Sequence, residues 1–234
     1  MTLSLPDIYN GSLSLIFAII TLFVGLRIAS KYFKYGDKNL IYVGIGWIGI
    51  SCPYISAGFS FLIALINETG LPTQIYFLIA AGITPIFLVL WTLAITNLLY
   101  QEYKKLIISI VVTISVLALS FFIYAIFFGI DLIGYKQGIS DTEWSTFMKI
   151  YFISLILYVL ATGLLFGVRS LKSSNPEIKL KGKFLIVAFV LLTFGAIIDS
   201  ILDDPLTRVI MMISAILFYF GWIMPEFIKK RLAK

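Results

Sequence analysis

The feature that most constrains this chain is a series of seven long apolar segments separated by short polar ones. About 20 apolar residues in a helix span the ~30 Å hydrocarbon core of a bilayer. By that measure the sequence predicts seven transmembrane helices. They lie at residues 8–29, 39–66, 73–100, 105–130, 147–168, 184–202 and 206–228. The segments take up nearly the whole chain, so we expect an all-α seven-transmembrane bundle formed by one domain, residues 1–234.

Composition supports a membrane environment over an aqueous one. The chain has 60% hydrophobic and 13% charged residues, whereas soluble domains have about 45–50% and about 25%. We therefore expect a multi-pass protein of the cell membrane, in contact with membrane lipids.

The basic residues predict an orientation. Fifteen of the 18 lie in loops on one side of the predicted spans, and only Lys136, Lys149 and Arg208 lie on the other. Cytoplasmic loops carry the excess of lysine and arginine, so we expect the N-terminus outside and the C-terminus inside. The net charge of +6 then reflects topology and contact with anionic headgroups. It does not indicate nucleic-acid binding.

Two parts of the chain resemble each other. "TLFVGLRIASK" (21–31) and "GLLFGVRSLKS" (163–173) both end a predicted span with Gly-x-Arg, and predicted spans 3 and 7 end in "QEYKK" and "PEFIKK". Spans 1–3 would then repeat as spans 5–7, with span 4 as a linker. Such a 3+1+3 design is that of sugar-transporting SWEET-type proteins, whose parallel repeats lie side by side in the membrane. Chance similarity between apolar helices with basic ends is the alternative.

Ionisable groups are nearly absent from the predicted spans, which excludes several functions. The chain has no histidine, a residue common in metal and acid–base sites. It has no lysine between Lys183 and Lys229 to form the Schiff base of a retinal protein. We therefore expect no enzyme activity, no metal, no cofactor and no retinal binding. At the outer end of span 6, Asp199, Asp203 and Asp204 suggest either a cation site or a solvated helix end.

Two prolines, Pro53 and Pro85, interrupt predicted spans 2 and 3. Each removes one backbone hydrogen bond and kinks its helix, and the freed carbonyl needs a new partner in hydrocarbon. Neutral polar and aromatic residues lie nearby and could line a pocket between the two kinks. The candidate ligand-binding residues are Ser51, Tyr54, Ser56, Thr84, Trp91, Thr92 and Asn97. Dry packing, with hydroxyls bonded to their own helices, is the alternative.

Three further features suggest contacts. The polar inner loop 169–183, with Asn175-Pro176 as a breaker, is either a partner-binding segment or a solvated anchor. Its basic residues are Arg169, Lys172, Lys179, Lys181 and Lys183. Gly163 and Gly167 form a close-packing motif that suits a neighbouring helix or a second copy of the chain. Asn10 and Asn67 begin glycosylation sequons, both placed outside.

The segment "SSNPEIKLKGKFLIVAF" (173–189), with "TGLLF" before it and "YFGWIMPEFIKK" near the C-terminus, resembles an uncharacterised family of archaeal seven-helix membrane proteins. The resemblance runs from span 1 to span 7 and implies a fold but no activity. The layout is also similar to the seven-helix sensor regions that precede histidine kinases, which implies signalling through a separate cytoplasmic partner.

Three functions follow as hypotheses. The first is a receptor-like or sensory protein that binds an apolar or lipid-like ligand and signals through its basic inner loops. The second is a SWEET-like transporter of small solutes. SWEET-type proteins hinge on prolines in both halves, and predicted spans 5 and 6 contain none, which argues against that mechanism. The third is a structural or lipid-organising membrane subunit.

Overall fold

The computed structural model describes residues 3–202, 204, 206–225 and 228. The chain divides into two compact units, Met1–Phe152 and Ile153–Lys234, and each is described by itself. The single domain expected from the sequence stays a prediction.

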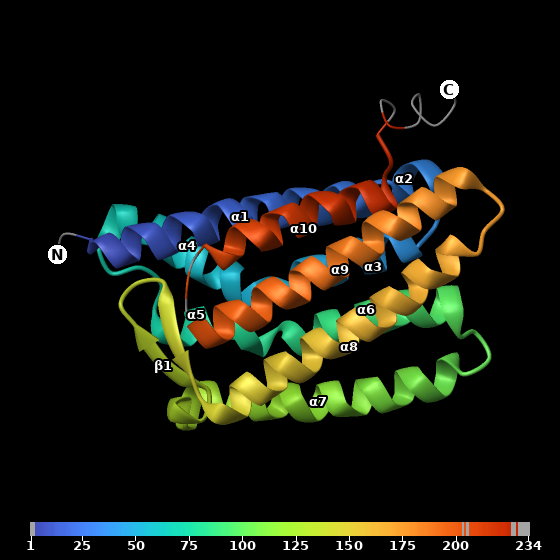
Figure 1. Cartoon of the computed structure of the whole chain (residues 1–234). Coiled ribbons are helices and arrows are strands. Elements are labelled where there is room, and N and C mark those ends of the chain that lie inside the picture. The colour runs from blue at the N-terminus through green and yellow to red at the C-terminus, as the bar shows by residue number, and fades with distance from the viewer. Residues whose placement is uncertain (1–2, 203, 205, 226–227, 229–234) are drawn as a thin grey trace. The chain divides into compact units, whose positions relative to one another are not determined.

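Long helices dominate the first unit, and a small β-hairpin lies at one end of them (Figure 1). Helix α1 begins where the Ser4 hydroxyl accepts a hydrogen bond from the backbone N–H of Asp7. The elements are α1 (Leu5–Ser30), α2 (Tyr32–Tyr35), α3 (Asn39–Ile50), α4 (Cys52–Asn67), α5 (Thr73–Phe77), the π-helical turn η1 (Leu78–Gly82), α6 (Thr84–Leu99), α7 (Lys104–Phe128), the 3-10 turn η2 (Ile130–Leu132), β1 (Gly134–Gln137), β2 (Asp141–Trp144) and the start of α8 (Thr146–Leu171).

The second unit contains the rest of α8, then α9 (Pro176–Leu202) and α10 (Thr207–Trp222). Helices α9 and α10 pack along each other. The Ser214 hydroxyl donates to the Ala188 carbonyl oxygen at 2.7 Å, and the rings of Phe189 and Phe218 meet edge to face at 5.6 Å.

Helices occupy all seven segments predicted from the sequence, but not every helix is long enough to cross a bilayer. Within the described residues, five helices have the length and apolar character of a span. The α3–α4 pair makes a sixth candidate if its two halves count as one. Helix α10 has 16 residues, a rise of ~24 Å, which is shorter than the ~30 Å hydrocarbon core. The end of the seventh predicted span at 226–227, and the basic residues from Lys229 on, lie outside the described residues.

The described residues are helical for the most part, as the predicted all-α class requires, and a short β-hairpin connects α7 to α8. Strands β1 and β2 pair antiparallel, with Gly134 opposite Trp144 and Gln137 opposite Asp141. The turn between them begins at Gly138, whose φ of +58° is a left-handed conformation that glycine adopts without strain. Strand pairing therefore orders residues 134–144, which connect α7 and η2 to α8.

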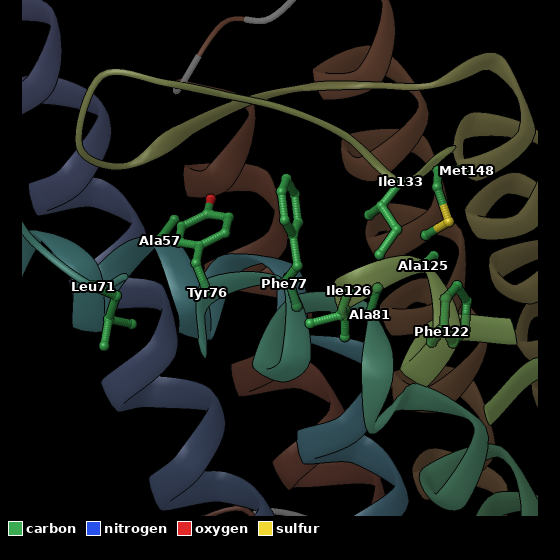
Figure 2. Packing of buried hydrophobic residues seen from close by; sticks show 11 residues of the cluster. Ala57, Leu71, Tyr76, Phe77, Ala81, Phe122, Ala125, Ile126, Ile133 and Met148 are labelled. Carbon is green, nitrogen blue, oxygen red and sulfur yellow. The ribbon is translucent and has the colours of Figure 1, made fainter. Parts of the chain in front are cut away.

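The core of the first unit lies beneath this hairpin, whose backbone passes over the buried side chains in Figure 2. Trp144 of β2 meets Phe77 at 5.7 Å and Phe152 at 4.9 Å, both edge to face. The cluster comprises Ala57, Leu71, Tyr76, Phe77, Ala80, Ala81, Phe122, Ala125, Ile126, Ile133 and Met148.

Each unit contains a close helix crossing made by a pair of glycines. In the first, a Cβ added to Gly44 of α3 would lie 2.3 Å from the carbonyl oxygen of Gly25 in α1. In the second, a Cβ added to Gly182 of α9 would lie 2.8 Å from the carbonyl oxygen of Gly167 in α8. Neither site has room for a side chain.

The two crossings share a second contact. In each crossing an isoleucine lies four residues after Gly44 or Gly182 on the same helix, and it packs against the partner glycine, Gly25 or Gly167. A Cβ on Gly25 would lie 2.5 Å from Ile48 Cγ1, and one on Gly167 would lie 2.6 Å from Ile186 Cγ1. Gly25 and Gly167 are the glycines of the two Gly-x-Arg motifs. The sequence similarity between these segments thus corresponds to the same local packing.

Candidate functional site

The second predicted span is broken at Ser51, which separates α3 from α4 with φ −96° and ψ 6°. The two helices meet at an angle of 64°. Pro53 lies in the first turn of α4; it has no N–H to donate, and its ring crowds the preceding turn. The kink predicted at Pro53 is confirmed.

Pro85 has a different effect. It follows the π turn η1, and α5, η1 and α6 remain one candidate span, Thr73–Leu99. Pro85 cannot donate to the carbonyl of Ala81, but the Thr84 hydroxyl does so at 2.7 Å. The Tyr151 hydroxyl lies 3.2 Å from the same Thr84 oxygen. The Thr84 hydroxyl therefore compensates the carbonyl that Pro85 frees.

Most of the predicted ligand-binding side chains are closed to solvent. Two bond to their own helices: the Ser56 hydroxyl donates to the carbonyl of Pro53 at 2.8 Å, and the Thr92 hydroxyl to that of Leu88 at 2.8 Å. The buried members are Ser51, Ser56, Thr84, Trp91 and Thr92, while Tyr54 and Asn97 are partly exposed. This geometry matches the packing alternative, and a role in ligand binding stays a prediction.

The predicted residues do not form one cluster. Trp91 packs against α3, where a Cβ on Gly46 would lie 3.3 Å from its Cα. Tyr54 meets Phe17 of α1 edge to face at 5.2 Å. Asn97 lies near the other end of α6, far along the helix from the break.

Asn97 ties α6 to the start of α3. Its side-chain Nδ2 donates to Oδ1 of Asn39 at 2.8 Å. This bond fixes the end of α3 that the charge pattern places on the inner side. Asn97 thus connects α6 to α3, and its role in ligand binding stays a prediction.

A second tie holds the middle of α4 against the turn of the hairpin. The Ser60 hydroxyl donates to the carbonyl of Ile139 at 2.5 Å and accepts from the N–H of Leu71 at 3.1 Å. Asp7 Oδ1 accepts from the N–H of Ile139 at 3.1 Å. Sequence reasoning missed these residues because no local pattern signals a contact between α4 and a turn 79 positions away.

Lys136 of β1 adds a further contact between the hairpin and the start of the Leu71–Tyr76 segment. Its Nζ donates to the carbonyl of Leu71 at 2.7 Å and lies 5.3 Å from the centre of the Tyr76 ring. Burial in this position lowers the pKa of Lys136, because desolvation disfavours the charged ammonium.

The predicted inner loop is largely helical. Pro176 starts α9, and the Asn175 side chain accepts from the N–H of Glu177 at 2.8 Å. Asn-Pro therefore lies at the interruption between α8 and α9, as predicted, and Pro176 also begins the second helix, since proline suits a first turn. Three of the predicted partner-binding residues lie on α9, namely Lys179, Lys181 and Lys183; Arg169 lies on α8, and Lys172 follows its end. Lys181 pairs with Glu177 at 2.9 Å.

The Gly163 and Gly167 face makes the close contact that the motif predicts, and it does so within the chain. A Cβ on Gly163 would lie 2.4 Å from the ring of Phe189, and one on Gly167 2.6 Å from Ile186. Helix α9 thus covers this face. Contact between two copies of the chain stays a prediction, and it would need other surfaces.

The remaining motifs are placed as follows. Asn10 is buried within α1, whereas Asn67 is exposed at the end of α4. Asp199 Oδ1 accepts from the Thr207 hydroxyl at 2.6 Å and lies 4.0 Å from Nε of the buried Arg208. Asp203, the second acid of that predicted group, lies outside the described residues.

In comparisons with protein-family models, with curated proteins and with solved structures, nothing matches this chain.

Proposed function

We propose that this chain is a receptor-like membrane protein that binds an apolar or lipid-like ligand and signals through its basic inner surface. The observation that carries the proposal is the broken span α3–α4, bent by 64° and held by a side-chain hydrogen bond in each of its two halves. The half formed by α4 is tied to the hairpin turn through Ser60, in the middle of the helix, and the half formed by α3 is tied to α6 through its first residue, Asn39.

This arrangement suits the transfer of a change from one end to the other. A broken span with a proline at the break has one point about which its halves can turn. A shift of the hairpin moves α4 through Ser60. The same shift changes the angle at Ser51 and the position of α3, and it reaches α6 through the Asn39–Asn97 bond.

The ligand would act at the break. Ser51, Ser56 and Thr92 are closed in this structure, so a ligand that contacts them binds a more open state. It would favour that state by its differential affinity, as any population shift requires. Neutral hydroxyls and aromatic rings suit an apolar ligand with one polar group.

Spin–spin distances across the break test this proposal. Cysteines for labelling would replace Leu40 on α3 and Leu65 on α4, in a Cys52→Ala background. Oleic acid and phytol serve as apolar probes. We expect at least one of them to shift the main Leu40–Leu65 distance, while a pair at Leu106 and Phe127 on the unbroken α7 stays fixed. A distance unchanged by both probes would count against the receptor proposal.

Signalling would pass to a separate cytoplasmic protein. Lys172, Lys179 and Lys183 are exposed, and their charges suit an acidic surface on such a partner.

A second candidate function is a small-solute transporter of 3+1+3 design. The matching glycine crossings, Gly25 with Gly44 and Gly167 with Gly182, favour it because they support a repeat of helix pairs. The unbroken α9, which has no counterpart of the break at Pro53, disfavours it. Uptake of labelled glucose and amino acids into proteoliposomes distinguishes the two. Saturable uptake would place the transporter first.

A further inference from the structure

The connection between α1 and α3 places aromatic side chains among lysines. We call residues 31–38 the α2 loop. Phe33 and Tyr35 are 89% and 63% exposed, and the exposed Lys34 lies between them. Lys31 and Lys38 are the first and last residues of the loop. Exposed aromatic rings are unfavourable in water, and alternation with lysine is typical of segments at a membrane surface.

Helix length places this loop in the headgroup layer. Together α1 and α2 form a single candidate span of 31 residues, Leu5–Tyr35, which rises ~46 Å at 1.5 Å per residue. The hydrocarbon core is ~30 Å thick, or about 40–45 Å with the headgroups. Arg27 is the first basic residue of the chain, and it is exposed. The helix beyond it therefore passes through the polar layer and ends near its surface.

The loop has an ordered backbone. The N–H of Gly36, at φ +69°, donates to the carbonyl of Tyr32 at 2.8 Å. The N–H of Asn39 donates to Oδ1 of Asp37 at 2.9 Å. Lys34 Nζ lies 5.3 Å from the centre of the Tyr35 ring. A preformed surface loses less conformational entropy on binding than a flexible tail does.

The charge of this surface is positive. Residues 27–39 contain four basic side chains and one acidic side chain, Asp37. The basic residues are Arg27, Lys31, Lys34 and Lys38. Each basic residue close to a membrane surface raises the affinity of a protein for anionic lipids by roughly fivefold.

We propose that the α2 loop is a binding site for anionic phospholipid. The lysines contact the lipid phosphate, and Phe33 inserts at the boundary between headgroups and acyl chains. The proposal does not depend on the receptor function, because a transporter or a structural subunit could carry the same site.

Lipid titration of the purified full chain, followed by native mass spectrometry, tests the site. The probes are dioleoyl phosphatidylglycerol and dioleoyl phosphatidylcholine. We expect the wild type to prefer phosphatidylglycerol. Lys31→Gln/Lys34→Gln/Lys38→Gln should lower phosphatidylglycerol affinity at least about tenfold and leave phosphatidylcholine binding unchanged.

A matched variant separates this site from general charge attraction. Lys172→Gln/Lys179→Gln/Lys183→Gln removes the same charge from exposed positions on α9 and just after α8, in a segment, residues 170–183, that contains no aromatic residue, and we expect a loss at least about threefold smaller than in the first triple variant. An equal loss in the two triple variants would overturn the proposal, as would an unchanged preference in the first.

Two further arms test the aromatic anchor and the source of the phosphate. Phe33→Ser keeps every charge and should weaken binding of both lipids several-fold, since the ring inserts beside either headgroup. Excess inorganic phosphate should not displace phosphatidylglycerol. Displacement would show a site for a free anion, and an unchanged affinity in Phe33→Ser would show that the ring stays in water. Either result contradicts the proposal.

Discussion

Thr84 illustrates how one hydroxyl compensates for a proline. It donates to the carbonyl of Ala81, which Pro85 leaves without its usual helical partner, and it lies 3.2 Å from the Tyr151 hydroxyl. We expect Thr84→Val to lower the free energy of unfolding by about 1 kcal/mol, the usual size of such a bond between membrane helices. Unfolding in mixed micelles with increasing dodecyl sulfate measures it.

The background variant Pro85→Ala provides the decisive comparison. An alanine at 85 supplies an N–H for the carbonyl of Ala81. Thr84→Val should therefore lower the free energy of unfolding less in the Pro85→Ala background than in the wild type. Thr113→Val is the control, because the exposed Thr113 donates only along its own helix, to Ser109 at 2.9 Å. An equal cost of Thr84→Val with and without Pro85 would contradict the explanation.

Lys136 of the hairpin makes the stability of the folded protein depend on pH. Burial lowers the pKa of Lys136 in the folded protein below its ordinary value of 10.5. Below the folded-state pKa the lysine is charged in both states, and the folded state bears the desolvation cost. As pH rises from the folded-state pKa towards 10.5, the folded protein releases its proton first, so the free energy of unfolding increases.

The comparison with Lys136→Met isolates this effect. Methionine keeps packing next to Tyr76 but does not titrate. We expect the stability of the wild type relative to Lys136→Met to rise over the alkaline range below pH 10.5, as measured by thermal unfolding in detergent. Lys149→Met removes a lysine from an exposed position and is the control. The same pH profile for both variants would mean that burial at Lys136 is not the cause.

The glycine crossings govern the packing of entire helices. A side chain at Gly44 or Gly182 would meet the backbone of the neighbouring helix at 2.3 Å or 2.8 Å, and backbone cannot move aside as a flexible side chain can. We expect Gly44→Leu and Gly182→Leu each to destabilise the protein by more than about 2 kcal/mol. Thermal unfolding of each variant measures the loss.

Gly129→Ala is the control for these two substitutions. Its Cβ would meet only the Leu132 side chain, at 3.2 Å, so we expect a small effect. If Gly182→Leu proved as mild as Gly129→Ala while Gly44→Leu did not, the two crossings would differ in strength. The similarity between the units would then be limited to sequence.

The elements that local sequence specifies were predicted best. Apolar length located the helices, and Pro53 marked the break. Asn175-Pro176 marked the interruption between α8 and α9, but not that α9 begins at this proline, with Asn175 accepting a hydrogen bond from its first turn. The hairpin and the Ser60–Ile139 bond could not be predicted, since they depend on which distant segments meet.

The whole molecule has a predicted direction in the membrane, with its N-terminus outside. Cysteines at single positions test it in a Cys52→Ala background. Gln137 on the hairpin and Ser174 between α8 and α9 are both exposed. We expect an impermeant maleimide to label Gln137→Cys in intact cells and Ser174→Cys only after permeabilisation. The reverse pattern would show that the charge asymmetry does not set the orientation.

The native cysteine reports most directly on the central claim, that a ligand opens the break in the second span. Cys52 is the only cysteine of the chain, is 2% exposed and is the first residue of α4. The measurement is the rate of its alkylation by N-ethylmaleimide in proteoliposomes, with and without oleic acid or phytol. We predict that one of these probes changes the rate at least about threefold, while Ser174→Cys in the Cys52→Ala background reacts at a constant rate. A Cys52 rate that neither probe alters would contradict the claim.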